Sequence, residues 1–258
     1  MPRYFVHLAY KGTAFHGWQI QPNASTVQEE LQKCLSILCR QAVETTGCGR
    51  TDTGVHASQF FAHFDTMQPI GNTEQMAFQL NALLSRDIRI YGIQEVHANA
   101  HARFDAFSRS YSYYILREPD PFLQELTWFN HRDFNLQRMN EAASLCRQHT
   151  DFACFAKAGG QSNSTICSVS VCRWIEEGKT LRFSVSANRF LRGMVRAMVG
   201  TMTEVGLGKL SLEAFAELLH QGDRKEAGES VPPQGLFLES VMYPYLKLPA
   251  SRVFGHEK

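Results

Sequence analysis

The segment from Gly47 to Gly54 holds the densest group of residues whose types and spacing could do chemistry. It reads GCGRTDTG, so Asp52 stands between two threonines in a glycine-flanked loop, two residues after Arg50. A carboxylate kept ionised by a nearby guanidinium can act as a nucleophile or as a base. The alternative is an Asx-turn that only ends a helix-to-strand connection. The local sequence alone leaves both interpretations open.

Two nucleotide-binding motifs fail on this segment. Gly49 and Gly54 have the spacing of a P-loop, but Val55 and His56 stand where Lys and Ser or Thr belong. A Gly-x-Gly-x-x-Gly pattern fails because Asp52 occupies the third glycine position. The segment also opens a predicted strand, whereas a phosphate cradle needs a helix N-terminus behind it.

A second segment, residues 179–203, carries positive charge without any carboxylate. Its five basic residues are Lys179, Arg182, Arg189, Arg192 and Arg196. On a predicted helix the last three share one face, where they could bind the phosphates of a nucleic acid. An ordinary solvated face, or side-chain stems lying over the core, would have the same composition.

Arginine and tyrosine alternate along a third segment, an extended stretch near residue 110. In a strand, Arg109, Tyr111 and Tyr113 point to the same face. Such a face can stack a base and hold its phosphate. The alternative is that the tyrosines belong to the core, with satisfied hydroxyl groups.

Composition limits the functions that remain. The 258 residues include 26 Lys and Arg against 25 Asp and Glu, so a polyanionic partner needs local evidence. No run of about 18 apolar residues and no apolar leader occurs, which predicts a cytoplasmic protein without a membrane segment. Seven cysteines without a Cys-x-x-Cys pair, and ten histidines without His-Glu-x-x-His, predict no metal site and mostly reduced, buried thiols.

The apolar spacing predicts the elements that must position these residues. Strands at 4–10, 55–64 and 88–96 alternate with a helix over 26–40, opened by a capping box from Ser25 to Gln28, and a helix around 76–84. A strand at 108–117, a helix at 136–146, a hairpin of 165–175 with 180–187, helices at 190–205 and 211–220 and a strand at 235–243 follow. We therefore predict an α+β protein with mainly antiparallel sheet, in two halves, 1–105 and 106–258.

Five sequence blocks, in order along nearly the whole chain, carry a family resemblance. They are YKGTAFHGWQIQ at 10–21, GRTDTGVHA at 49–57, ARFDA at 102–106 followed by Tyr111, NRFLRGMVRAMVG at 188–200 and AGESVPPQGLFL at 227–238. Together they resemble the tRNA pseudouridine synthase A family, and the second block is the most specific.

The resemblance implies a fold and an activity. The fold would be the pseudouridine synthase fold, two α+β halves around a central catalytic cleft, assembled as a homodimer that binds tRNA. The activity would be isomerisation of uridine to pseudouridine in the anticodon stem-loop, at tRNA positions 38, 39 and 40. Isomerisation exchanges neither electrons nor groups, so no cofactor is expected.

The resemblance also implies roles for individual residues. Asp52 matches the catalytic aspartate, Tyr111 the tyrosine that stacks on the target uracil, and Arg196 the arginine that pairs with the aspartate. Leu236 matches the apolar residue against the base, and Arg50 lies in the same motif loop as Asp52. The arginines expected to contact RNA outside the reacting base are Arg109, Arg189 and Arg192.

Three departures from the family pattern are visible. Thr53 replaces the usual Ala after the aspartate, Lys11 stands where Asp is usual, and Arg192-Gly193 differs from the common pattern. They concern details of RNA contact more than the reaction. Two alternative functions remain: a non-catalytic tRNA-binding or RNA-folding protein on the same scaffold, and a synthase of this family that modifies other RNA positions.

Overall fold

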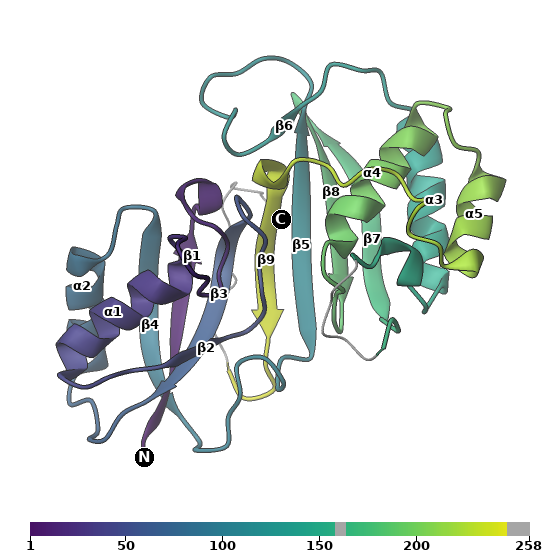
Figure 1. The fold of residues 1–258 in the computed structure, drawn as a ribbon. Coiled ribbons are helices and arrows are strands. Elements are labelled where there is room, and N and C mark those ends of the chain that lie inside the picture. Colours follow the sequence, from purple (N-terminus) through teal and green to yellow (C-terminus); the bar gives the residue numbers. More distant parts are fainter. Residues whose placement is uncertain (158–163, 247–258) are drawn as a thin grey trace. The chain divides into compact units, whose positions relative to one another are not determined.

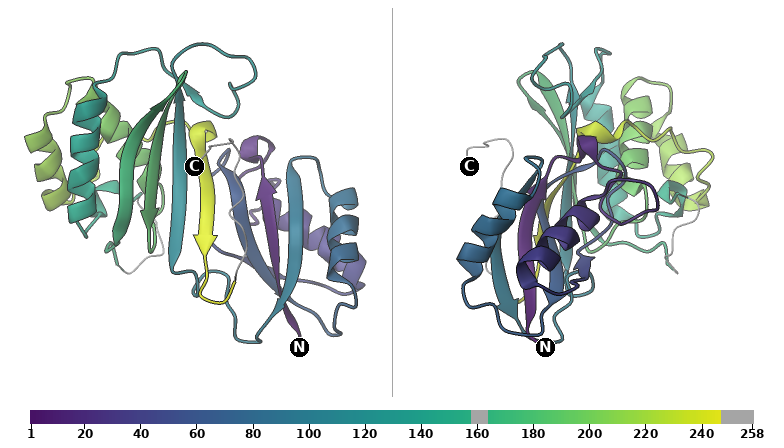
Figure 2. Two further views of the ribbon diagram at one scale, coloured as in Figure 1. Left: turned by 180° about the vertical axis from the view of Figure 1, so that it is seen from behind. Right: turned by 60° about the vertical axis from the view of Figure 1, so that its left-hand side comes forward.

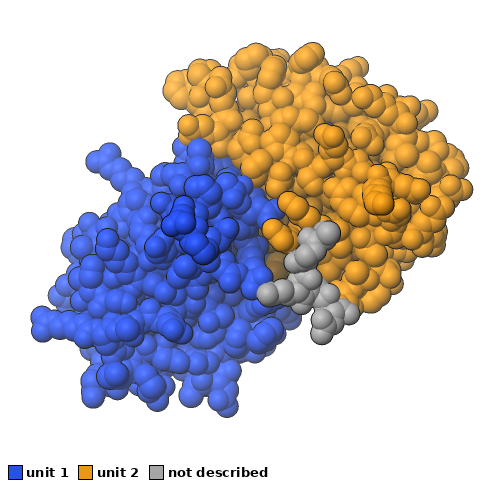
Figure 3. All heavy atoms as spheres, in the orientation of Figure 1, with its two compact units in different colours: residues 1–107, 237–258 blue, residues 108–236 orange. Residues whose placement is uncertain are grey.

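The computed structural model of this chain describes residues 1–157 and 164–246, which belong to two compact units (Figure 3). Of these residues, unit 1 contains Met1–Phe107 and 237–246, and unit 2 contains those between Ser108 and Leu236. The predicted division near residue 105 placed everything after it in the second half. In the structure the chain returns to unit 1, because its last strand pairs there.

Unit 1 is built on strands β1 (Arg3–Tyr10), β2 (Thr45–Gly47), β3 (His56–Asp65), β4 (Ile88–Val96) and β9 (Leu236–Met242), of which the first residue, Leu236, still belongs to unit 2. β1 lies between β4 and β3 and is antiparallel to both. β3 also pairs antiparallel with β2 and parallel with β9, through His56–Phe237 and Ala57–Leu238. Helices α1 (Val27–Cys39) and α2 (Thr73–Leu83) pack against each other, and α2 packs against β4 (Figure 1).

The start of α1 differs from the predicted capping box by one residue. The hydroxyl of Thr26, not Ser25, accepts a hydrogen bond from the backbone N–H of Glu29 at 3.3 Å. Thr26 is buried and has extended dihedral angles, which suit an N-cap. The register of the helix is unaffected: Leu31 and Leu35 are fully buried, as their spacing predicted.

Unit 2 contains strands β5 (Ser108–Leu116), β6 (Trp128–Phe129), β7 (Val169–Glu177) and β8 (Thr180–Ala187). β8 is antiparallel to β5 and β7, which confirms the predicted hairpin, and β6 pairs parallel with β5. Helices α3 (Leu136–Gln148), α4 (Met194–Gly206) and α5 (Leu212–Gln221) pack together, with α3 against β7 (Figure 2). The α+β class with mainly antiparallel sheet is therefore confirmed.

Helix α4 begins at Met194 rather than near residue 190. Gly193 precedes it with a φ of 71°, a left-handed conformation that interrupts the helical path. Arg189 and Arg192 consequently lie before the helix, and the prediction that they share a helix face with Arg196 is wrong. The helix itself is almost entirely buried and belongs to the core of unit 2.

Among the residues that the structure describes, no helix is both long and apolar enough to cross a membrane. The seven cysteines are free thiols, and all but Cys39 are buried.

Candidate active site

Asp52 lies in the loop that connects β2 to β3 in unit 1. The turn is closed by a hydrogen bond from the N–H of Val55 to the Asp52 carbonyl oxygen at 3.2 Å, and Gly54 in the turn has a φ of 77°. Asp52 is partly exposed, whereas its neighbours Arg50 and Thr53 are exposed. The loop therefore holds its carboxylate at the surface of unit 1.

The shape of this loop is set by the first sequence block, residues 10–21. A Cβ atom on Gly17, whose φ is 86°, would lie 2.2 Å from the carbonyl oxygen of Thr51, and one on Gly12 would lie 2.0 Å from that of Val55. The hydroxyls of Tyr10 and Thr51 share a hydrogen bond of 2.9 Å. Only glycine permits backbones to approach this closely, so the two blocks form one structure.

Further contacts fix both ends of the loop. The N–H of Gly54 donates to the Phe15 carbonyl at 3.2 Å, and the N–H of Gly12 donates to Nδ1 of His56 at 2.9 Å. The His56 ring is buried and stacks on Phe237 of β9, with centroids 4.6 Å apart. The last strand of unit 1 therefore supports the first residue of β3, directly after the Asp52 loop.

The sequence interpretation gave no role to Gly12, Gly17 or His56, although all three position the loop. The glycines stood in a block that contributed only to the resemblance. The sequence did contain a signal for them, because two glycines in a segment without a predicted helix or strand are typical of a loop that packs closely against other backbone. Of the two departures in this region, Thr53 is exposed at the turn, and the backbone N–H of Lys11 donates to the Asp87 carbonyl at 2.8 Å.

In unit 2, Tyr111 and Tyr113 of β5 have different surroundings. Tyr111 is partly exposed and meets Phe190 edge to face, with centroids 5.0 Å apart and planes at 86°. Tyr113 is fully buried, and its hydroxyl donates to the Pro232 carbonyl at 2.8 Å. Burial raises the pKa of Tyr113 above its usual range, and the nearby guanidinium of Arg196 opposes that rise. Tyr113 therefore fits the core-tyrosine interpretation, while Tyr111 keeps an accessible ring.

Arg196 is held by two hydrogen bonds to one residue. Its Nε donates to the Val231 carbonyl at 2.7 Å, and the Val231 N–H donates to the Arg196 carbonyl at 3.3 Å. The chain after Val231 then packs on β5, since a Cβ on Gly235 would lie 2.8 Å from Cζ of Tyr113. Leu236 follows and is 6% exposed. Unit 2 thus gathers Arg196, Tyr113 and the segment that ends in Leu236.

The positive charge of residues 179–203 is partly neutralised within unit 2. Arg182 pairs with Glu177 at 2.5 Å, and Lys179 pairs with Glu118 at 3.6 Å. The absence of carboxylates from the sequence segment therefore overstated its charge, because β7 and the segment after β5 supply them.

Arg109 lies beside the segment that precedes α4. Its Nη1 donates to the Asn188 carbonyl at 3.2 Å, and Oδ1 of Asn188 accepts from the Ser168 N–H at 2.8 Å. The Arg192 carbonyl accepts a hydrogen bond from the Lys157 N–H at 2.9 Å. Arg192 is exposed, and Arg189 is partly exposed. These contacts hold the backbone of the segment.

Each unit carries a distinct part of the predicted site. Unit 1 carries Arg50 and Asp52, and unit 2 carries the remaining predicted residues, Arg109, Tyr111, Arg189, Arg192, Arg196 and Leu236. Within residues 1–157 and 164–246, no group of three or more His, Cys, Asp and Glu side chains is arranged to hold a metal ion.

Comparison with known proteins relates these motifs to a family. A family model described as tRNA pseudouridine synthase matches residues 148–244. The tRNA pseudouridine synthase A of Bacteroides thetaiotaomicron is 47% identical over 95% of this chain and 91% of its own length. Those of Parabacteroides distasonis and Porphyromonas gingivalis are 45% and 44% identical, each over 95% of this chain and 97% and 98% of their own lengths. At this identity and coverage, the chain belongs to the tRNA pseudouridine synthase A family of isomerases and has the pseudouridine synthase fold.

Proposed function

We propose that this protein isomerises uridine to pseudouridine in the anticodon stem-loop of tRNA, at positions 38, 39 and 40, with Asp52 as the catalytic carboxylate. The observation that carries the proposal is the Asp52 loop, a partly exposed carboxylate on a turn that two glycines and a tyrosine of another segment hold in place. The tRNA substrate follows from the names of the relatives. The positions follow from the family resemblance.

The reaction needs one well-placed carboxylate. The N1–C1′ bond breaks, the uracil turns while it stays bound, C5 bonds to C1′, and the C5 proton leaves. A carboxylate serves three routes: attack on C1′, attack on C6, and removal of a sugar proton to give a glycal. Each route ends with the same atoms rearranged, so no electrons or groups have to be supplied.

The residues of unit 2 fit the other needs of this reaction. An accessible tyrosine ring can hold the detached base by stacking, worth about 1–3 kcal/mol, and we assign this role to Tyr111. Leu236 would exclude water from the base. From the family resemblance we assign to Arg196 the role of pairing with the carboxylate of Asp52, and the hydrogen bond from its Nε to the Val231 carbonyl would orient the guanidinium.

Contacts to the RNA backbone would offset the cost of exposing the target. A uridine in or beside a stem must be flipped out of its stack, which costs a few kcal/mol. Phosphate contacts read RNA shape with little base specificity, so neighbouring uridines could reach one active site. We assign such contacts to Arg109, Arg189 and Arg192, whereas Arg50 is assigned to substrate binding beside Asp52.

The decisive test compares wild-type protein with Asp52→Asn. The amide keeps the size of the side chain but is a poor nucleophile and base, so tritium release from C5-labelled uridine in tRNA should fall below detection. tRNA affinity, measured by filter binding, should persist because phosphate contacts elsewhere dominate it.

Asp87→Asn is the matched control, because Asp87 is also partly exposed in unit 1 but lies outside the loop. It should keep wild-type turnover. Turnover of Asp52→Asn within about tenfold of wild type would reject Asp52 as the catalytic group. If wild-type protein binds tRNA but forms no pseudouridine, the non-catalytic alternative holds. Mapping of pseudouridine in the modified tRNA tests the three positions.

We also propose a cytoplasmic homodimer, since tRNA is the substrate and an anticodon arm is long relative to a protomer of 29.2 kDa. Light scattering of dilute, active protein should give twice the protomer mass. A fully active monomer would overturn the assembly without affecting the proposed reaction.

A further inference from the structure

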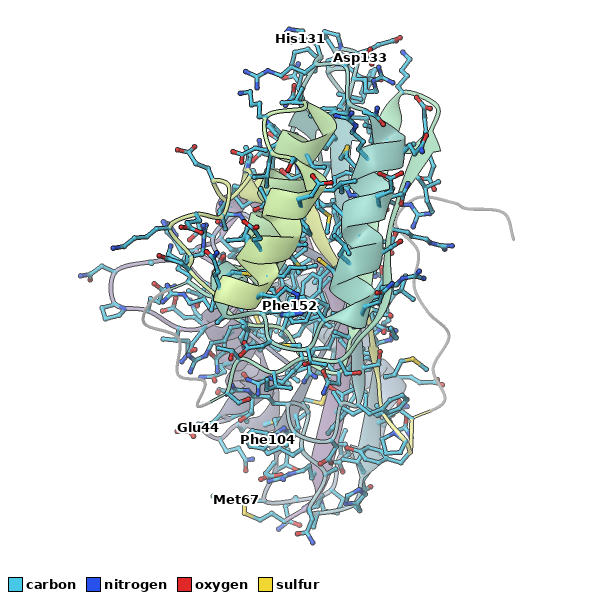
Figure 4. All side chains as sticks on the ribbon, turned by 90° about the vertical axis from the view of Figure 1, so that its right-hand side faces the viewer. Glu44, Met67, Phe104, His131, Asp133 and Phe152 are labelled. Atoms are coloured by element: carbon cyan, nitrogen blue, oxygen red, sulfur yellow. The ribbon has the colours of Figure 1, made fainter. Side chains whose placement is uncertain are left out.

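A tight turn at residues 101–105 of unit 1 presents two side chains to solvent. It follows β4 and contains Arg103 and Phe104 of the third sequence block, to which the proposed reaction gives no role. Phe104, labelled in Figure 4, is 74% exposed, and Arg103 is exposed as well. A phenylalanine this exposed contributes little to the core, so its ring is accessible to a ligand.

Hydrogen bonds within the turn fix its shape. The N–H of His101 donates to the Asp105 carboxylate at 2.7 Å, and the N–H of Asp105 donates to the His101 carbonyl at 3.1 Å. The N–H groups of Arg103 and Phe104 both donate to Nδ1 of His101, at 3.1 and 3.2 Å. The His101 imidazole and the Asp105 carboxylate therefore accept hydrogen bonds from three backbone N–H groups of the turn.

Three contacts anchor the turn to the rest of unit 1. The Ala102 N–H donates to Nδ1 of His63 at 3.1 Å, and the Tyr243 hydroxyl donates to the Ala102 carbonyl at 2.5 Å. The Tyr245 hydroxyl donates to the Asp105 carboxylate at 2.8 Å. Burial lowers the pKa of His63 to about 4, so its Nδ1 stays an acceptor at neutral pH. The turn that carries Phe104 is thus held in place by hydrogen bonds to His63, Tyr243 and Tyr245.

The surroundings of this ring are aromatic and cationic. The His101 ring lies 4.2 Å from it between centroids, at 31°, and the guanidinium carbon of Arg103 lies 5.6 Å from its centroid. A nucleobase stacks on an aromatic face whatever its identity, and a guanidinium beside it can bind the adjoining phosphate or stack on the base. An apolar protein partner would be served less well by a ring flanked by arginine and histidine.

We propose that the turn at residues 101–105 is an RNA-contact site outside the reacting centre, in which Phe104 stacks on an unpaired nucleobase and Arg103 binds a neighbouring phosphate. This inference rests on the proposed function, because it takes tRNA as the ligand. It predicts that the site contributes to tRNA affinity and not to the chemical step.

The test compares Phe104→Ala with Phe78→Ala in tRNA binding. Phe78 is a matched control, since it is 76% exposed in the same unit but lies on α2. Loss of one stacked base should weaken tRNA binding about 5- to 140-fold in Phe104→Ala, with Phe78→Ala near wild type. Phe104→Trp, which keeps a stacking face, should restore the affinity. Arg103→Ala should lower the salt slope of binding by about 0.7–0.9.

Turnover at saturating tRNA and oligomeric state complete the experiment. Phe104→Ala should keep the single-turnover rate of wild type and differ only in the tRNA concentration it needs. Equal tRNA affinity in Phe104→Ala and wild type would overturn the proposal, as would dissociation of a wild-type dimer by this substitution, which would show a protein interface instead. A wild-type protein that binds tRNA without forming pseudouridine would reject the proposed reaction but leave this contact testable by binding.

Discussion

Replacing Gly17 by Ala should slow the reaction about 100-fold although Gly17 lies outside the Asp52 loop. A Cβ at this position would lie 2.2 Å from the Thr51 carbonyl oxygen and 3.2 Å from the Asp52 carbonyl carbon. Since real Cβ contacts stay above 3.0 Å, the Thr51 carbonyl oxygen must move away by about 1 Å. A displacement of this size lowers the reaction rate about 10²-fold when it is passed on to a reacting group. The φ of 86° adds about 1–2 kcal/mol of backbone strain in alanine.

Gly49→Ala is the matched control for this change. Gly49 stands inside the most specific sequence block, yet a Cβ there would meet nothing within 4 Å, and its backbone is not left-handed. We expect single-turnover tritium release to fall about 100-fold in Gly17→Ala, and to change little in Gly49→Ala. tRNA affinity should remain near wild type in both variants. Equal activity of the two variants would refute the idea that residues 10–21 position the carboxylate.

Three further predictions concern the ring of Tyr111, the arginines and pH. Tyr111→Phe keeps the stacking face, so turnover falling about 10²–10⁴-fold at constant tRNA affinity would show that the hydroxyl moves a proton, and full activity would leave stacking as its role. Arg192→Ala should lower the salt slope of tRNA binding by about 0.7–0.9, whereas Arg182→Ala, which breaks the ion pair with Glu177, should not; equal slopes would return Arg192 to an ordinary solvated residue. Burial lowers the pKa of His7 to about 4 in the folded protein. As the pH falls below about 6.5, His7 is therefore protonated first in the unfolded chain, and the free energy of unfolding decreases toward pH 4 by up to about 1.4 kcal/mol per pH unit. Urea unfolding at pH 5 and 7.5 should show a smaller difference in His7→Phe, and an unchanged difference would place the titration elsewhere.

Local patterns predicted most of the secondary structure. β4 and β8 begin and end at the predicted residues, because alternating apolar side chains mark a strand that is buried on one face. The late start of α4 was foreseeable from Gly193, which breaks a pattern that otherwise has helical spacing. Strands β2 and β6 were not predicted, since two or three residues carry no measurable period.

Long-range relations could not be derived from the sequence. The pairing of β9 with β3 joins residues about 180 positions apart through two register pairs, and nothing local encodes that choice. The same holds for the close approach of Gly17 to the Thr51 carbonyl, because it depends on the packing of two loops against each other. Residues 49–57 were enough to single out Asp52 as a candidate. The residues that hold its loop, Gly12, Gly17 and His56, could be recognised only from the three-dimensional structure.

The return of the chain to unit 1 has a consequence for the order of events during synthesis. Unit 2 is one continuous stretch, whereas unit 1 is missing a strand until Phe237 and the residues after it have been made. At about 5–20 residues per second, the ribosome takes roughly 6 to 26 s between Phe107 and Phe237. Throughout that interval the start of β3 lacks its parallel neighbour, and His56 lacks the ring on which it stacks. The nascent chain therefore lacks part of the support of the Asp52 loop until its final strand has been made, so a stalled or truncated product would be released without the contact between His56 and Phe237.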